Sequence, residues 1–214
     1  MKKLFILFSL AIITLITNAQ VNQANQFVIK SGYVEYELTG SVTGTKKFWW
    51  DNYGDKTRNE TESTSIIQFF GTTTKEEQHT ITITDENTIY TQDLIKGTAY
   101  KSSNDEYEEI ANEMTEDMTD AEIEQLGEDI LASLGGERLG TEKVIGKECE
   151  VIKVMMAKVW IYKGIPLKSI AKVMKIETNE TAVKFDENIS IPSSTFAPDK
   201  GVEFQDVSEF GEEY

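Results

Sequence analysis

The stretch from Glu148 to Lys175 constrains the fold most, because its pattern excludes a helix and predicts a hairpin. Within it, Val159-Trp160-Ile161-Tyr162 is a run of β-branched and aromatic residues, which favours a strand. Neighbouring side chains on a strand point to opposite faces, so we expect this strand to be covered on both sides. Lys163-Gly164 then predicts a turn, and the alternation that begins at Ser169 predicts the returning strand.

Further strands are predicted before and after this hairpin. Short alternating or aromatic segments recur about every ten residues between turn signals, as in an antiparallel meander. They cover Phe27–Leu38, Phe48–Trp50, Lys56–Thr61, Ser65–Phe70, His79–Thr84, Thr88–Gln92 and Thr98–Ser102, and a later strand follows through Glu180–Ser190. The chain is therefore predicted to be mainly β.

Two helices are predicted between these groups of strands, near 105–114 and 120–134. Thr119 and Glu122 have the spacing of a capping box, and Gly135-Gly136 is a stop signal. The apolar residues recur at steps of three or four; they are Ile110, Met114, Ile123, Leu126, Ile130 and Leu134. We expect Met114, Ile123, Leu126 and Ile130 to face the sheet.

The predicted helices are strongly acidic, with twelve acids and no bases between Asp105 and Asp129. Calcium is one interpretation of such a segment, but the spacing of a calcium-binding loop is absent. A solvated acidic face is the better interpretation, and we expect no metal.

The N-terminus has the pattern of a secretory signal peptide. Lys2 and Lys3 precede an apolar run from Leu4 to Ile16, and Ala19 is a small residue at the cleavage position. The run is short for a membrane span, which needs about 20 apolar residues, so a retained anchor is the less favoured alternative. We therefore predict a signal peptide over 1–19, a single domain over 20–204 and an acidic tail over 205–214, in a periplasmic or secreted protein with no transmembrane span after cleavage.

Charge and cysteine content exclude several classes of function. The net charge is −16, and removal of the two lysines in the first 19 residues makes it −18. Such a chain is repelled by phosphates, so we expect no nucleic-acid partner. Cys149 is the only cysteine, so no internal disulfide can form, and we expect it to be a small buried hydrophobic residue.

No catalytic motif stands out. Zinc sites draw on several His or Cys ligands, and this chain has one of each; His79, the sole histidine, is best interpreted as an exposed strand residue. The nucleophile elbow and the glycine-rich phosphate loops are missing. We expect no cofactor and no enzymatic activity; an enzyme of unknown class ranks third among the alternatives.

The exported, sheet-rich chain with two helices inserted between its strands resembles the lipoprotein-carrier superfamily of the Gram-negative periplasm. Its C-terminal half is similar to an uncharacterised secreted bacterial domain near that superfamily, through Gly146–Val151, Val159–Lys168 and Phe196–Val202. The resemblance implies an α+β, mainly β fold: a strongly curved antiparallel sheet (an incomplete barrel) with two helices across its concave face.

The resemblance also implies binding of something apolar, such as a lipid or acyl chain. Five bulky apolar residues are the candidate ligand-binding residues: Trp49, Phe70, Met114, Met156 and Trp160. The leading hypothesis is a monomeric, exported binding protein without catalytic activity. The alternative is a module that binds an envelope protein or has a structural role there, and needs no small ligand.

Overall fold

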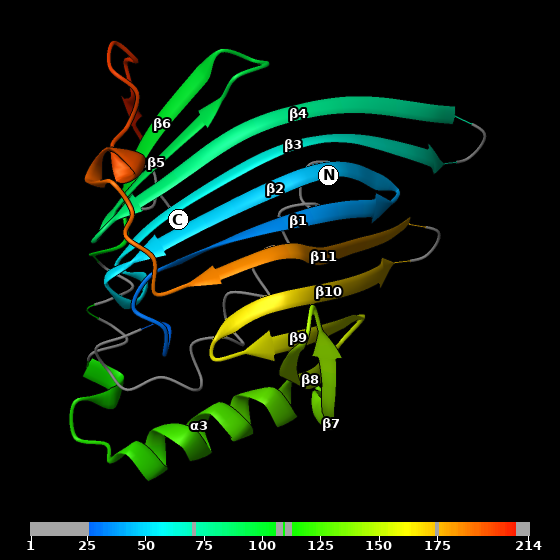
Figure 1. The fold of residues 1–214 in the computed structure, drawn as a ribbon, viewed down its shortest axis with the longest axis vertical. Coiled ribbons are helices and arrows are strands. Elements are labelled where there is room, and N and C mark those ends of the chain that lie inside the picture. Colours follow the sequence, from blue (N-terminus) through cyan, green and yellow to red (C-terminus); the bar gives the residue numbers. More distant parts are fainter. Residues whose placement is uncertain (1–25, 70–71, 106–108, 110–112, 174–175, 209–214) are drawn as a thin grey trace, which may run out of the picture.

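The computed structural model describes residues 26–69, 72–105, 109, 113–173 and 176–208 (Figure 1). Twelve strands form one open sheet that is not closed into a barrel, which confirms the mainly β prediction. The strands are β1 (Gly32–Gly40), β2 (Val42–Asp51), β3 (Lys56–Phe69), β4 (Thr72–Asp85), β5 (Thr88–Asp93), β6 (Thr98–Ser103), β7 (Glu137–Val144), β8 (Lys147–Val154), β9 (Ala157–Tyr162), β10 (Ile165–Val173), β11 (Ile176–Glu187) and β12 (Gln205–Asp206).

Two antiparallel meanders make up this sheet, and they meet at its centre. The order is β12-β6-β5-β4-β3-β2-β1-β11-β10-β9-β8-β7. The first strand of the chain, β1, therefore lies between β2 and β11, with Val34 opposite Phe48 on one side and Phe185 on the other. The only parallel pair is β12 with β6, at one edge of the sheet that the structure describes.

The hairpin that the sequence predicts is formed by β9 and β10. Lys163 and Gly164 make its turn with φ values of 49° and 86°. Trp160 is 3% exposed and belongs to the main core, whereas its neighbours Val159 and Ile161 belong to a second core. Alternate side chains of β9 are thus buried on opposite faces, as predicted.

The main core gathers around Trp50, whose indole N–H donates to the carbonyl of Ile29 over 2.9 Å. Gly32 lets the ring lie directly on β1, because a Cβ there would stand 2.2 Å from the Trp50 ring. This core consists of Phe27, Ile29, Val34, Tyr36, Trp50, Val144, Cys149, Val151, Trp160, Ile165, Leu167 and Ala182. The burial of Cys149 confirms its predicted role as a small hydrophobic residue, and burial also raises the pKa of its thiol.

Strands β3 to β6 carry fewer apolar side chains. Ile81 and Ile83 are their buried apolar residues among those described. The chain after β11 crosses this part of the sheet: the short 3-10 helix η3 (Ser193–Phe196) contacts β3 and β4, and Phe204 packs edge-on against Tyr90. Figure 1 shows η3 and the following segment, in orange, beside these strands. Two strands, Lys56–Thr61 and Ser65–Phe70, are predicted from the sequence where the structure has the single 14-residue strand β3.

The helix predicted near 120–134 is α3 (Asp120–Ser133). The helix predicted near 105–114 lies partly outside the described residues; residues 105, 109 and 113–115 are helical. In the part of the chain that the structure describes, no helix is long and apolar enough to span a membrane. The predicted signal peptide lies outside the described residues. Strand β7 was not predicted, because every side chain from Glu137 to Lys143 is exposed and leaves no apolar pattern.

Candidate functional site

The two ends of α3 are set by its sequence. At the N-terminus, the Thr119 amide donates to the Glu122 carboxylate over 2.8 Å and the Glu122 amide returns a bond to Thr119 Oγ1, which is the predicted capping box. The Thr119 amide and hydroxyl, which both donate to the Glu122 carboxylate, hold the pKa of Glu122 below its usual value. At the C-terminus, Gly135 (φ 67°) donates to Ala132 and Gly136 donates to Leu131, a Schellman motif.

The sheet contacts α3 through Leu131. This side chain is 8% exposed and forms the second core with Ile152 and Val154 of β8 and Val159 and Ile161 of β9. Figure 1 shows α3, in green, at the β7–β9 end of the sheet.

The rest of the apolar stripe of α3 is only partly covered. Ile130 and Leu134 are 46% and 38% exposed, and Ile123 and Leu126 are half-buried. Ile130 therefore does not take the inward place expected from the sequence; its neighbour Leu131 does. An amphipathic helix normally buries its whole stripe, so the exposed part of this stripe is a departure from that pattern.

An ion cluster also joins α3 to the sheet. Arg138 of β7 donates from Nε to Glu128 of α3 over 2.8 Å, and its other guanidinium nitrogens contact Glu128 and Glu150 of β8. Hydrogen bonding to Glu128, against some desolvation, raises the pKa of Arg138 above its usual range. Sequence reasoning missed Leu131, Glu128 and Arg138. Their spacing in the sequence does not show that they meet in space.

The predicted ligand-binding residues lie in different environments. Trp160 is in the main core, where its indole donates to Glu142 over 2.8 Å, while Trp49 is half-buried against the Tyr33 ring, 5.0 Å away between centroids. Met114 and Met156 are 58% and 62% exposed. Phe70 lies outside the described residues. Their contact with a ligand stays a prediction.

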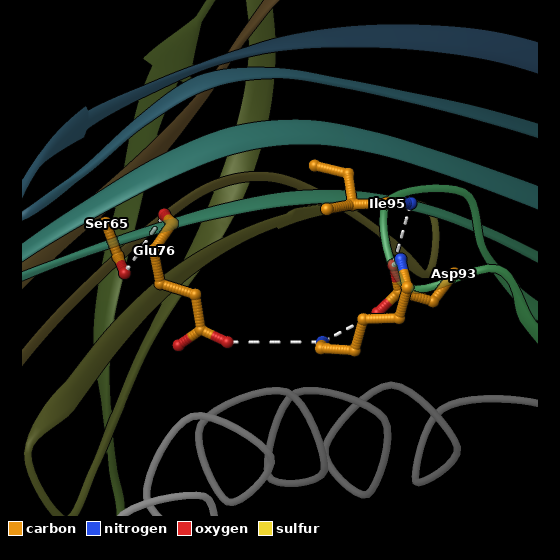
Figure 2. Close-up of polar contacts among 5 residues, drawn as sticks. Ser65, Glu76, Asp93 and Ile95 are labelled. Atoms are coloured by element: carbon orange, nitrogen blue, oxygen red, sulfur yellow. Dashed lines mark hydrogen bonds and ion pairs between the residues drawn. The ribbon is translucent and has the colours of Figure 1, made fainter.

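A polar cluster fixes the turn between β5 and β6 against β4 (Figure 2). Asp93 accepts the backbone N–H groups of Ile95 and Lys96 over 3.0 and 2.9 Å and the ammonium group of Lys96 over 2.6 Å. Burial raises the pKa of Asp93, but these bonds outweigh it and the net pKa is lowered. Lys96 also lies 4.0 Å from Glu76, whose carbonyl accepts from Ser65. The polar groups of this cluster bond to one another, so its role is structural: it holds the β5–β6 turn in place.

His79 of β4 lies beside Glu60 of β3. Its Nε2 lies 3.5 Å from Glu60 Oε1, and the other oxygen of Glu60 lies 3.6 Å from Arg58. The His79 side chain is 29% exposed, which is less than the exposed position predicted from the sequence. Among the residues described, no group of three or more His, Cys, Asp or Glu side chains is arranged to hold a metal ion.

Comparison with protein-family models finds no match, and no curated protein matches the sequence. Solved structures do match. An uncharacterised conserved protein from Thermus thermophilus aligns over 86% of this chain and 94% of its own, with a TM-score of 0.52 and 7% identity. This likeness shows a shared overall fold and nothing about function.

Two further solved structures align with lower scores. PNGF-II aligns over 85% of this chain and 32% of its own, with a TM-score of 0.43 and 11% identity. LprF from Mycobacterium bovis aligns over 84% and 95%, with a TM-score of 0.33 and 9% identity. Scores of this size carry no argument about this chain. Membership of the lipoprotein-carrier superfamily therefore stays a prediction from the sequence.

Proposed function

We propose that this chain is an exported binding protein, without catalytic activity, that holds an apolar ligand such as a lipid or acyl chain between α3 and the sheet. The observation that carries the proposal is the half-covered stripe of α3, in which Leu131 is buried while Ile130 and Leu134 are exposed. Exposed apolar stripes on soluble proteins mark binding surfaces for ligands or partners. An apolar ligand would complete the cover that the sheet supplies only at Leu131.

The curvature of the sheet bears on the resemblance to an incomplete barrel, and it is indicated on the face of the main core, opposite the face that Leu131 of α3 contacts. The Tyr36 hydroxyl on β1 donates over 2.8 Å to the carbonyl of Pro166 on β10, although β11 lies between these two strands. The bond passes over Ala182, whose small side chain leaves room. We infer that the open sheet bends towards this face, as an incomplete barrel would. Export rests on the N-terminal pattern of Lys2, Lys3 and the apolar run that follows.

Native mass spectrometry of the protein purified from a bacterial envelope fraction, before and after delipidation, tests the proposal. We expect a bound mass in the lipid range that delipidation removes, and uptake of an environment-sensitive apolar dye by the stripped protein. Ile123→Asp and Leu126→Asp should each lower dye uptake, because a carboxylate in the stripe is costly to bury.

Val183→Asp is the matched control, since Val183 is equally apolar but lies on β11 and is 55% exposed. It should leave dye uptake unchanged. A wild-type protein with neither bound lipid nor dye uptake would contradict the proposal. Co-purification with an envelope protein in that case would favour the interaction module.

A further inference from the structure

A pair of aromatic rings lies on the face of the sheet that is turned away from the main core. Tyr33 of β1 and Trp49 of β2 are direct cross-strand partners, with ring centroids 5.0 Å apart and ring planes tilted by 41°. Their chain neighbours Val34 and Trp50 are fully buried in the main core, so alternation along the strands puts Tyr33 and Trp49 on the opposite face. We call this pair the aromatic platform.

The exposure of the platform sets it apart from the other large aromatic residues at the centre of the sheet. Trp50 and Trp160 are 0% and 3% exposed, whereas Trp49 and Tyr33 are only half-buried. Neither ring of the platform belongs to the main core or to the second core. A cross-strand aromatic pair stabilises a sheet through its own contact, and the platform also leaves ring surface open to solvent.

Charged side chains of both signs surround the platform on the same face. Asp186 of β11 and Arg58 of β3 continue its cross-strand row on either side. With the two adjacent rows across β11, β1, β2 and β3, the border comprises four acids and four bases: Glu35, Asp51, Glu60, Asp186, Lys47, Lys56, Arg58 and Lys184. The border therefore has no net charge, although the whole chain carries −16.

Contacts beside the rings hold several of these charged groups in place. The Tyr33 hydroxyl donates to Glu35 over 3.0 Å, and the ammonium group of Lys184 lies 5.2 Å from the Tyr33 ring centroid and 3.1 Å from Asp186. A carboxylate has several acceptor positions and an ammonium group has three donors, so each can bond to a ligand as well as to its neighbour.

We propose that the aromatic platform binds a neutral carbohydrate, with the apolar face of a sugar ring lying on the Tyr33 and Trp49 rings. A sugar ring presents C–H groups on its faces and hydroxyl groups, which both donate and accept, around its edge. Aromatic rings bordered by equal numbers of acceptors and donors match that chemistry.

The same border disfavours other classes of ligand. A lipid surface would have to desolvate all of these charges, which is costly. An anionic or a cationic ligand would meet as many like charges as opposite ones. An open platform covers only one side of a ligand, so we expect weak binding, with a dissociation constant of roughly 1 mM for an oligosaccharide.

Tryptophan fluorescence tests the proposal, because Trp50 and Trp160 are buried and acrylamide quenching therefore reports mainly on Trp49. The probes are cellohexaose, maltohexaose and chitohexaose, which are uncharged oligomers of glucose or N-acetylglucosamine. At about 5 mM, at least one of them should shift the emission to shorter wavelength and lower the quenching constant about twofold or more, since a bound sugar covers the ring.

Substitutions separate a binding platform from a merely structural pair. Trp49→Ala and Tyr33→Ala should each weaken oligosaccharide binding about tenfold or more in calorimetry, whereas Tyr33→Phe keeps the ring and should stay within about twofold of wild type. Tyr100→Ala is the matched control, because Tyr100 is an exposed aromatic residue of β6 outside the platform, at 40% exposure. It should leave binding unchanged.

Three results would overturn the proposal: no binding of any of the three oligosaccharides, equal binding by wild type and Trp49→Ala, or an equal loss in Tyr100→Ala. Protection of Trp49 by phosphatidylcholine vesicles instead of sugars would also overturn it, in favour of a lipid surface. The proposal does not rest on the apolar ligand at α3, and delipidation should leave oligosaccharide binding unchanged. A protein that binds the sugar but neither lipid nor dye would contradict only the proposed function.

Discussion

The two halves of the sheet are built in different ways. Strands β8 to β11 with β1 and β2 hold the main core, in which Trp50 and Val151 are fully buried. Strands β3 to β6 hold Ile81 and Ile83, and the first seven residues of β4 are all exposed. We call the first region the body and the second the wing. The comparison teaches that backbone pairing can extend a sheet well beyond its core, provided that something else covers the extension.

In the wing, that cover comes from the segment after β11. Phe196 is 3% exposed, and Arg58 of β3 donates to the carbonyl of Thr195 over 3.5 Å. Val207 then donates to Lys101 over 2.8 Å beside β12. The stability of the wing is therefore predicted to depend on a few residues of this segment, whereas the stability of the body depends on the many residues of the main core.

The largest effect should come from the body. Trp160→Ala should lower the free energy of unfolding by about 3–5 kcal/mol, because it removes a buried ring and leaves a cavity. Urea denaturation measures this. Trp49→Ala is the control: its ring is only half-buried, so about 1 kcal/mol is expected. A loss below about 1 kcal/mol for Trp160→Ala would show that β9 is not central.

A smaller, local effect should follow Phe196→Ala. Removing this buried ring should cost about 3 kcal/mol, confined to the wing. Hydrogen exchange should then rise in β3 to β5 and stay unchanged in β8 to β10. Thr195→Ala keeps the carbonyl that Arg58 uses and should change little. Equal exchange increases in wing and body would mean that the two regions unfold as one unit.

The junction between α3 and the body can be tested at Gly136. A Cβ there would stand 2.2 Å from Leu131 Cδ1 and 2.8 Å from Leu131 O, so Gly136→Ala should cost about 1–3 kcal/mol in thermal or urea unfolding. Gly135→Asn is the matched change, because position 135 has φ 67° and open space, and Asn accepts that backbone. If both variants cost the same, close packing at Gly136 is not the cause.

The smallest effect should appear at alkaline pH at Tyr33, on β1 of the body. Burial, followed by the hydrogen bond to Glu35, raises the pKa of Tyr33 from 10.0 to about 12. The unfolded chain therefore releases this proton first, and the associated stability is complete below pH 10 and lost between pH 10 and 12. Between pH 10 and 12, the free energy of unfolding of Tyr33→Phe should fall by about 1 kcal/mol less than that of the wild type, allowing for screening of the partly exposed ring. If urea unfolding gives parallel curves of stability against pH for Tyr33→Phe and the wild type, the prediction is contradicted.

The sequence predicted what local patterns encode. The strand Val159–Tyr162, the turn at Lys163-Gly164 and the capping box at Thr119 all depend on neighbours in the chain, and all are confirmed. It could not predict β7, whose side chains are exposed up to Lys143 and whose place is set by pairing with β8.

The candidate site was harder to predict for the same reason. Ile130 and Leu131 are adjacent and both apolar, and only the angle at which α3 meets β8 decides which one is buried. Arg138 lies ten residues from Glu128, and the Schellman motif between them brings the two together. Nothing in the spacing of these residues marks them as partners.

The central pairing of β1 with β11 has a consequence for the speed of folding. Its partners, from Gly40 with Thr178 to Gly32 with Glu187, are 138 to 155 residues apart in the chain. Each meander can assemble from contacts between consecutive strands. The pairing of β1 with β11, in contrast, requires closure of a very long loop, which is slow. The two meanders should therefore collapse early and join late, so the rate-limiting step is the docking of β11 against β1.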